Sequence, residues 1–128
     1  MGQRQEDHQY WLSLTGLWRI AAIGCLISVT VLSLLPGEDV PKTSLTDKQS
    51  HFIAYASLCF LFSMGWVRWA TWKWMIMAAF YGVFIEFCQQ FTSRTPDPLD
   101  ALANSLGALL GLALVVIIRS GLKSFGRS

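Results

Sequence analysis

The chain has 128 residues, of which 53% are hydrophobic and only 14% are charged, and its mean hydropathy is +0.43. A soluble domain carries about 25% charged residues, whereas four membrane helices of roughly 20 residues would use about 80 positions. The composition therefore excludes a separate soluble domain of ordinary size. A net charge of +2 without a basic stripe excludes a nucleic-acid-binding protein.

Four apolar segments predict an all-α fold: a polytopic membrane protein made of one four-transmembrane-helix bundle over residues 1–128. The segments cover about residues 17–35, 50–67, 72–91 and 99–118. Each should be a helix, because backbone polar groups inside a bilayer must bond within their own segment. The first segment could instead be a cleaved signal peptide, but it is long for one, and no small-residue cleavage pattern follows Pro36-Gly37.

Basic residues predict that the N-terminus, the C-terminus and the loop between the second and third segments are cytoplasmic. Seven Lys and Arg residues fall on that side and three on the other, as the positive-inside bias requires. The seven are Arg4, Arg19, Arg68, Lys73, Arg119, Lys123 and Arg127, and the three are Lys42, Lys48 and Arg94. The six tryptophans, Trp11, Trp18, Trp66, Trp69, Trp72 and Trp74, fall at the same inner boundary. Indole rings favour such an interface, so they support this orientation independently.

No motif for a cofactor or a metal ion is visible. The sequence has no phosphate loop, dinucleotide fingerprint, nucleophile elbow or metal-ligand spacing. Cys25, Cys59 and Cys88 each lie inside an apolar run, at a spacing that fits neither a zinc site nor a disulfide framework. We expect them to act as small apolar side chains, and we expect no cofactor.

Polar residues gather at the outer ends of the second, third and fourth segments and form a candidate substrate-binding site. The expected members are Asp47, Lys48, His51, Glu86, Gln89, Arg94, Asp100 and Asn104. Asp47, His51 and Tyr55 are spaced four apart and share one helical face. A local alternative is that Thr46 and Gln49 form a capping box, with Asp47 only complementing the helix dipole.

Glu86 is harder to explain locally. It lies five residues before the predicted exit at Phe91, which places it roughly 7 to 8 Å below the helix end. A carboxylate at that depth is costly and normally faces a partner in the bundle. Gln89 and Gln90 follow three and four positions later and should extend the same face. Glu86 either lines a functional pocket or is a protonated carboxyl that joins two helices.

The fourth segment combines capping and packing signals. Asp97 is a candidate N-cap, with Pro98 in the first helical position and Asp100 in the third. Helix capping therefore explains in part why an acid stands at position 100. Asn104 lies one turn deeper on the same face. Gly107 and Gly111 form a small-xxx-small pair, which predicts close helix packing.

Together these residues predict a polar pocket reached from the outer leaflet. Lys48, His51 and Arg94, with the positive dipole ends of the second and fourth segments, suit an anionic group such as a phosphate or carboxylate. Glu86, Asp47 and Asp100 could neutralise or orient those cations, or act as acid and base.

The ordered set of motifs resembles the VanZ-like family over about residues 32–112. The matching runs are Leu34-Leu35-Pro36-Gly37; Asp47-Lys48-Gln49-Ser50-His51-Phe52-Ile53-Ala54-Tyr55; Glu86-Phe87-Cys88-Gln89-Gln90-Phe91 with Arg94; and Asp100-Ala101-Leu102-Ala103-Asn104-Ser105-Leu106-Gly107, ending at Gly111. The resemblance implies a small multi-pass protein of the bacterial cytoplasmic (inner) membrane, and the family's namesake is associated with low-level teicoplanin resistance. Thr92-Ser93 departs from the family, where Pro-Gly often precedes the arginine, so the turn that carries Arg94 should differ.

Two functional hypotheses follow. The chain binds or modifies an anionic envelope lipid or cell-wall precursor and affects glycopeptide susceptibility, or it is a non-catalytic membrane module or partner subunit of an envelope assembly. The first rests on the outer polar residues, and the second on the lack of a recognised nucleophile or metal site. A transporter is a third alternative, but four short spans would form a pathway only in a homo-oligomer.

Overall fold

Four α-helices make up the fold, as the sequence predicts. The computed structural model describes the backbone of residues 2–125 and the side chains of residues 14–125, and this part of the chain contains no strand. The helices are α1 (Gly2–Leu34), α2 (Asp47–Gly65), α3 (Thr71–Gln89) and α4 (Pro98–Phe125). The helices α1 and α4 extend well beyond the predicted apolar segments. The side chains of Arg4 and Trp11, and all of Arg127, lie outside the described residues.

Local sequence signals set the helix boundaries. Pro36-Gly37 follows one residue after the end of α1 at Leu34. The predicted capping box begins α2: the Thr46 hydroxyl accepts from the backbone N–H of Gln49, and the Gln49 side chain accepts from the N–H of Thr46. At α4, the Asp97 carboxylate accepts from the N–H of Leu99, so its predicted N-cap is also confirmed. These caps satisfy orphan N–H groups that a helix start would otherwise leave exposed.

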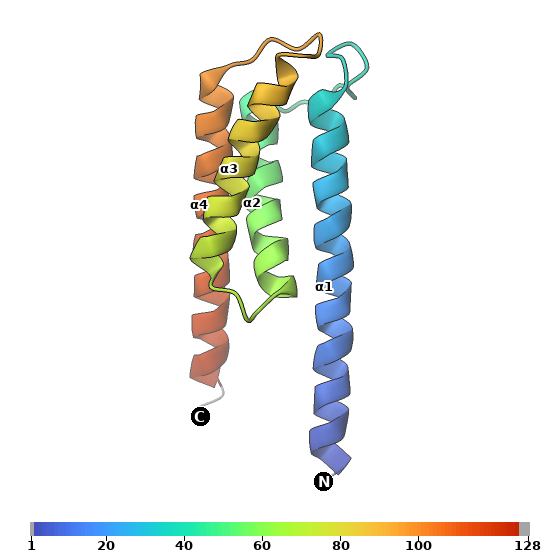
Figure 1. Ribbon diagram of the computed structural model, residues 1–128. Coiled ribbons are helices and arrows are strands. Elements are labelled where there is room, and N and C mark those ends of the chain that lie inside the picture. Colours follow the sequence, from blue (N-terminus) through green and yellow to red (C-terminus); the bar gives the residue numbers. More distant parts are fainter. Residues whose placement is uncertain (1, 126–128) are drawn as a thin grey trace.

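The helices run alternately up and down, so both termini lie at one end (Figure 1). The loops at residues 35–46 and 90–97 lie at the opposite end, which we call the loop end. The α2–α3 turn at residues 66–70 lies on the side of the termini, and we call that side the turn end. Helices α2, α3 and α4 pack as a group, while α1 contacts α2 and α3 and, within the described residues, does not contact α4.

Two glycines bring α2 and α4 into backbone contact. A Cβ on Gly107 would overlap the carbonyl oxygen of Phe52, and a Cβ on Gly111 would lie 2.5 Å from the carbonyl oxygen of Ala56. Glycine is therefore required at both positions, because any side chain would push the helices apart. This contact holds the first half of α4 against α2, beside the polar residues of the candidate site.

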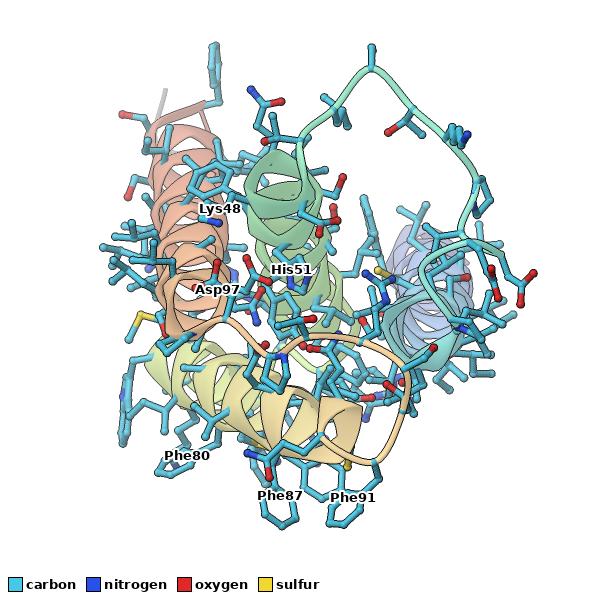
Figure 2. The ribbon with its side chains drawn as sticks, turned by 90° about the horizontal axis from the view of Figure 1, so that it is seen from above. Lys48, His51, Phe80, Phe87, Phe91 and Asp97 are labelled. Carbon is cyan, nitrogen blue, oxygen red and sulfur yellow. The ribbon has the colours of Figure 1, made fainter. Side chains whose placement is uncertain are left out.

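The distribution of side chains is inverted relative to a soluble protein. Half of the ten buried apolar residues in the described part of the chain are small, among them Ala22, Ala56, Ala78 and Ala108, and the buried polar residues include Asn104. Large apolar side chains lie outside. Phe80 and Phe91 are 71% and 79% exposed, and with Phe87 they point away from the bundle (Figure 2). A soluble protein rarely exposes such a continuous apolar surface.

Two helices are long and apolar enough to cross a membrane: Leu14–Leu34 of α1 and Pro98–Phe125 of α4. Helices α2 and α3 have 19 residues each, which corresponds to about 28 Å. Their polar residues, among them Lys48, His51 and Glu86, lower their apolar character while leaving them close to the length of a membrane span.

Candidate functional site

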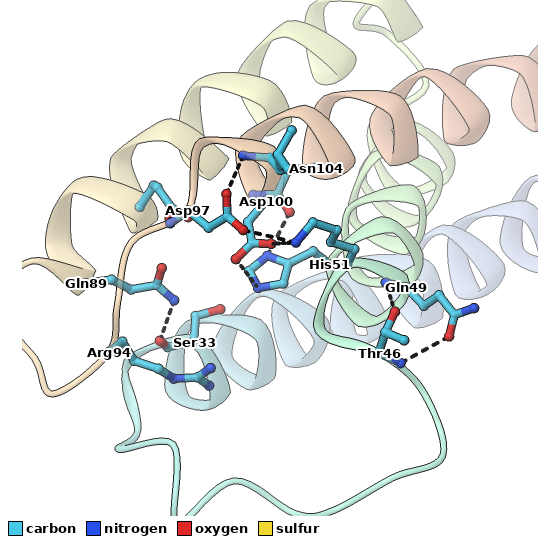
Figure 3. Close-up of polar contacts among 12 residues, drawn as sticks. Ser33, Thr46, Gln49, His51, Gln89, Arg94, Asp97, Asp100 and Asn104 are labelled. Carbon is cyan, nitrogen blue, oxygen red and sulfur yellow. Dashed lines mark hydrogen bonds and ion pairs between the residues drawn. The ribbon is translucent and has the colours of Figure 1, made fainter.

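His51 is the centre of a polar network at the loop end (Figure 3). Its Nδ1 lies 2.9 Å from Oδ1 of Asn104, a fully buried residue of α4. An amide oxygen can only accept, so Nδ1 is the donor. Nε2 faces Oδ2 of Asp100 at 4.0 Å. Both ring nitrogens of His51 therefore face oxygen atoms of α4, which holds the imidazole in one orientation.

Lys48 is paired with two acids from the start of α4. Its Nζ donates to Oδ2 of Asp97 at 3.0 Å and lies 3.6 Å from Oδ1 of Asp100. The carboxylate of Asp97 raises the pKa of Lys48 above its ordinary value. The pKa of Asp97 is lowered, first by the N–H of Leu99 and then by Lys48. The cation expected to meet an anionic ligand is thus already neutralised by the protein.

Glu86 reaches the start of α4 from α3. Its Oε1 accepts a hydrogen bond from the backbone N–H of Asp97. Its second oxygen, Oε2, is buried and has no hydrogen-bond partner within the described part of the chain. One carboxylate oxygen of Glu86 therefore holds the backbone just before α4, and the other makes no hydrogen bond within the described part of the chain.

Gln89 and Arg94 bind the last turn of α1 through its backbone. Nε2 of Gln89 donates to the carbonyl oxygen of Ser33 at 2.9 Å. Arg94 donates from Nε to the carbonyl of Leu35 at 3.0 Å and from Nη2 to the carbonyl of Leu32 at 2.9 Å. These carbonyls lack partners within the helix, so the two side chains cap α1 and tie it to α3.

A cavity of about 560 Å³ lies between α1, α2 and the loop at residues 35–46. Seen from above, this loop bows outward between the two helices (Figure 2). Its apolar lining comes from Val29, Leu32, Val40, Pro41, Leu45 and Ala54, and its polar lining includes Lys42, Asp47, Ser50, His51 and Arg94. The cavity thus joins an apolar wall to a polar rim with two permanent cations.

The predicted site residues fall into three groups. Asp47, His51 and Arg94 line the cavity, whereas Lys48, Glu86, Asp100 and Asn104 belong to the network behind it, and Gln89 is buried against α1. His51 is common to the cavity and the network. The prediction that Gln90 extends the face of Glu86 is wrong, because α3 ends at Gln89 and Gln90 is exposed.

The sequence predicts Tyr55 on the face of His51 and Asp97 at a helix start, but neither is among the predicted site residues. Tyr55 is fully buried and lines the cavity, and its hydroxyl has no hydrogen-bond partner among the described residues. Its spacing from His51 was the signal that could have identified it. Asp97 serves as a cap, an ion-pair partner and a donor to Glu86. Of these roles only the first has a local sequence signature.

The described side chains contain no group of three or more His, Cys, Asp or Glu residues placed to hold a metal ion. What the arrangement offers chemically is a mixed apolar and polar cavity, together with an imidazole of fixed orientation at its wall.

Comparison with known proteins yields a match to one family. No curated protein and no solved structure matches the chain. The family model described as VanZ/LLP1 matches residues 26–119. That range begins in the last third of α1 and includes the cavity, the network and the close contact of α2 with α4. It confirms the resemblance seen in the motifs: the chain belongs to the VanZ/LLP1 family.

Proposed function

We propose that the chain crosses a bacterial cytoplasmic membrane with all four helices. The inverted distribution of side chains supports this proposal, because large apolar residues outside and small or polar residues inside suit a lipid environment. Helices α2 and α3, at about 28 Å, span most of a hydrocarbon layer of roughly 30 Å.

The proposed orientation places the turn end in the cytoplasm and the loop end outside. The basic residues Arg68 and Lys73 lie at the turn end, together with the described tryptophans. Basic loops favour the cytoplasmic side. The candidate site then opens towards the outer leaflet.

At the loop end, the proposed ligand is an anionic amphiphile, either an envelope lipid or a lipid-linked cell-wall precursor. The cavity between α1 and α2 carries this proposal. Val29 and Leu32 would contact a hydrocarbon chain, while Lys42 and Arg94 would face the anionic headgroup. A headgroup there would also meet His51, whose orientation Asn104 and Asp100 hold.

A non-catalytic module is the second candidate, and the pairing within the site favours it. Lys48 is bonded to Asp97, and Arg94 is bonded to α1, so both have structural partners without any ligand. On this alternative the loop end is a surface for another envelope protein, and effects on glycopeptide susceptibility are indirect.

A pair of fusions tests the orientation. A fluorescent protein fused after Ser128 should fluoresce in the cytoplasm, and alkaline phosphatase inserted within residues 42–45 should be active. The opposite result would place the candidate site in the cytoplasm and end the outer-leaflet proposal.

Lipid retention by the purified chain tests the ligand. Ala54→Trp should fill the apolar wall of the cavity and reduce the amount of anionic lipid that copurifies with the chain, measured by mass spectrometry. Ala79→Trp, at a half-buried position of α3 away from the cavity, is the matched control. Equal lipid retention by the two well-folded variants would contradict the cavity as the binding site.

A further inference from the structure

Charges are separated along the bundle. The described acids all lie towards the loop end: Glu38, Asp39, Asp47, Glu86, Asp97 and Asp100. Five described cations lie towards the turn end: Arg19, Arg68, Lys73, Arg119 and Lys123. Among residues 14–125, none of the acids accompanies them. The turn end therefore carries a net positive charge that the rest of the described bundle does not neutralise locally.

Two of the five cations form hydrogen bonds within the protein. Arg19 donates from Nε to the carbonyl of Gly65 at 2.8 Å. Arg119 donates from Nη2 to the carbonyl of Ser63 at 2.8 Å and from Nη1 to the hydroxyl of Thr71 at 2.9 Å. Both arginines cap the C-terminal carbonyls of α2 and join α1 and α4 to it. Their role is structural.

Arg68 and Lys73 are different, because both face outward together with indole rings. Arg68 is exposed within the α2–α3 turn. The Nζ of Lys73 lies 5.8 Å from the ring centroid of Trp69 and 5.7 Å from that of Trp72, and both rings are about half exposed. A cation held over exposed indoles, as Lys73 is, combines positive charge with side chains that favour the boundary between water and lipid.

We infer that this surface, made of Arg68, Trp69, Trp72 and Lys73, binds the anionic headgroups of phospholipids in the adjoining leaflet. Charge complementarity supports this partner, since the surface has two unneutralised cations and the headgroups carry negative charge. The tryptophans support a lipid surface in particular, because their rings would lie at headgroup depth. The inference rests on the proposed four-span topology, but it does not depend on a ligand in the outer cavity.

Brominated lipids provide a readout confined to this end. All the tryptophans with described side chains lie in the half of the bundle near the turn, and none of them lines the cavity. The full chain is reconstituted in phosphatidylcholine vesicles that contain a small fraction of lipid brominated near the headgroup. The brominated lipid is phosphatidylglycerol in one sample and phosphatidylcholine in the other. The quantity measured is the ratio of tryptophan quenching by the two lipids.

In the unaltered chain, brominated phosphatidylglycerol should quench more strongly. Each cation near an anionic surface should enrich that lipid by about fivefold. Arg68→Gln and Lys73→Gln should each reduce the ratio, and the double variant should reduce it further. Glu38→Gln changes one charge at the opposite end, outside the cavity lining, and should leave the ratio unchanged. Comparing the two lipids within each variant cancels any change in intrinsic fluorescence.

Equal quenching by the two lipids in the unaltered chain would overturn the inference, and so would a ratio that the double variant does not lower. Absence of quenching by either lipid would instead contradict the membrane topology itself. None of these outcomes depends on lipid retention by the outer cavity.

Discussion

His51 and Asn104 meet because the next turns of their helices are in backbone contact. The hydrogen bond between them, 2.9 Å long, lies beside the place where Gly107 of α4 touches the carbonyl of Phe52 on α2. The register of α2 against α4 is thus set by a glycine, and the same register positions the imidazole at the cavity wall.

The His51–Asn104 bond should contribute measurable coupling between α2 and α4. In a double-mutant cycle of His51→Ala and Asn104→Ala, we expect a coupling free energy of about 0.5 to 2 kcal/mol, the range for hydrogen bonds between membrane helices and for contacting residues. Unfolding of the purified chain in mixed micelles measures it. Additive effects of the two substitutions would mean that the bond does not stabilise the bundle.

Even alanine should be too large at Gly107. A Cβ there would overlap the Phe52 carbonyl, and neither backbone can move aside without separating the helices. Gly107→Ala should therefore lower the free energy of unfolding by about 1 to 3 kcal/mol, and Gly107→Leu and Gly111→Leu should reduce the folded yield. Gly24→Ala is the control, because a Cβ at Gly24 has no heavy atom within 4 Å. Leu114→Ala is a second control, at an exposed position deeper in the same helix. Similar stabilities for Gly107→Ala and Gly24→Ala would contradict the close contact.

The Lys48–Asp97 pair predicts a stability that is flat at neutral pH and falls at both extremes. The folded protein lowers the pKa of Asp97 below its ordinary 3.8, so this stabilisation is complete above that pH and is lost as the pH falls through the folded pKa. The pKa of Lys48 is raised above 10.5, so its share is complete below that pH and is lost as the pH rises through the folded pKa.

Asp97→Asn isolates the charge, because asparagine can still cap Leu99. In thermal unfolding from about pH 2 to 8, the variant should be less stable than the unaltered chain by a constant amount near neutral pH. This difference in stability should disappear in acid. Asp39→Asn, which removes an exposed carboxylate from the same end, is the control. A deficit independent of pH would assign the effect to geometry rather than charge.

Arg94 should hold the end of α1. Arg94→Gln removes two donors to the carbonyls of Leu32 and Leu35, and hydrogen bonds from a charged group are worth enough to speed local opening by about tenfold. Hydrogen exchange in peptides covering residues 29–37 measures this opening. Unchanged exchange with loss of lipid retention would instead assign Arg94 to the ligand.

The variant Glu86→Gln tests whether the carboxylate of Glu86 has a functional role or a structural one. Glutamine can still accept from the N–H of Asp97 through its amide oxygen, so the helix entry should survive. If the charge serves the pocket, the variant should lose whatever phenotype the gene confers, such as altered glycopeptide susceptibility, at near-normal membrane levels. His51→Ala, Arg94→Ala and Asn104→Ala should behave alike.

A structural Glu86 predicts the reverse pattern. Glu86→Gln would keep full activity, and Glu86→Ala would lower the protein level by leaving the N–H of Asp97 without its partner. Full activity of Glu86→Gln, in an assay that responds to deletion of the gene, would remove the charged-pocket hypothesis at its central residue.

Features of the fold that depend on neighbouring residues could be predicted from the sequence. The capping box at Thr46 and the cap at Asp97 were predictable because each motif is complete within four residues. The full lengths of α1 and α4 could not be predicted in this way. The prediction followed apolar character, and a helix can continue past the segment that lipid would cover. The pair of Lys48 with Asp97 also escaped prediction, since several acids at that end could have been its partner.

The long-range ties of the site had no signature in the sequence. Arg94 contacts carbonyls about sixty residues earlier in the chain, and every residue carries a carbonyl. Charge suggested only an anionic ligand for Arg94, whereas the structure also bonds it to the end of α1. The same applies to Gln89, whose partner is the carbonyl of Ser33.

Binding α1 through its carbonyls has an evolutionary consequence. A donor that contacts the main chain does not read the side chain attached to it, so the identity of residues 32, 33 and 35 is free of those bonds, while Gln89 and Arg94 are constrained. The sequence of α1 can then change to suit another lipid or another host while the helix keeps its position in the bundle. In an alignment of relatives, the amino-acid sequence of α1 should vary more than that of the end of α3 and of the loop after it, because these two segments supply the donors that hold α1.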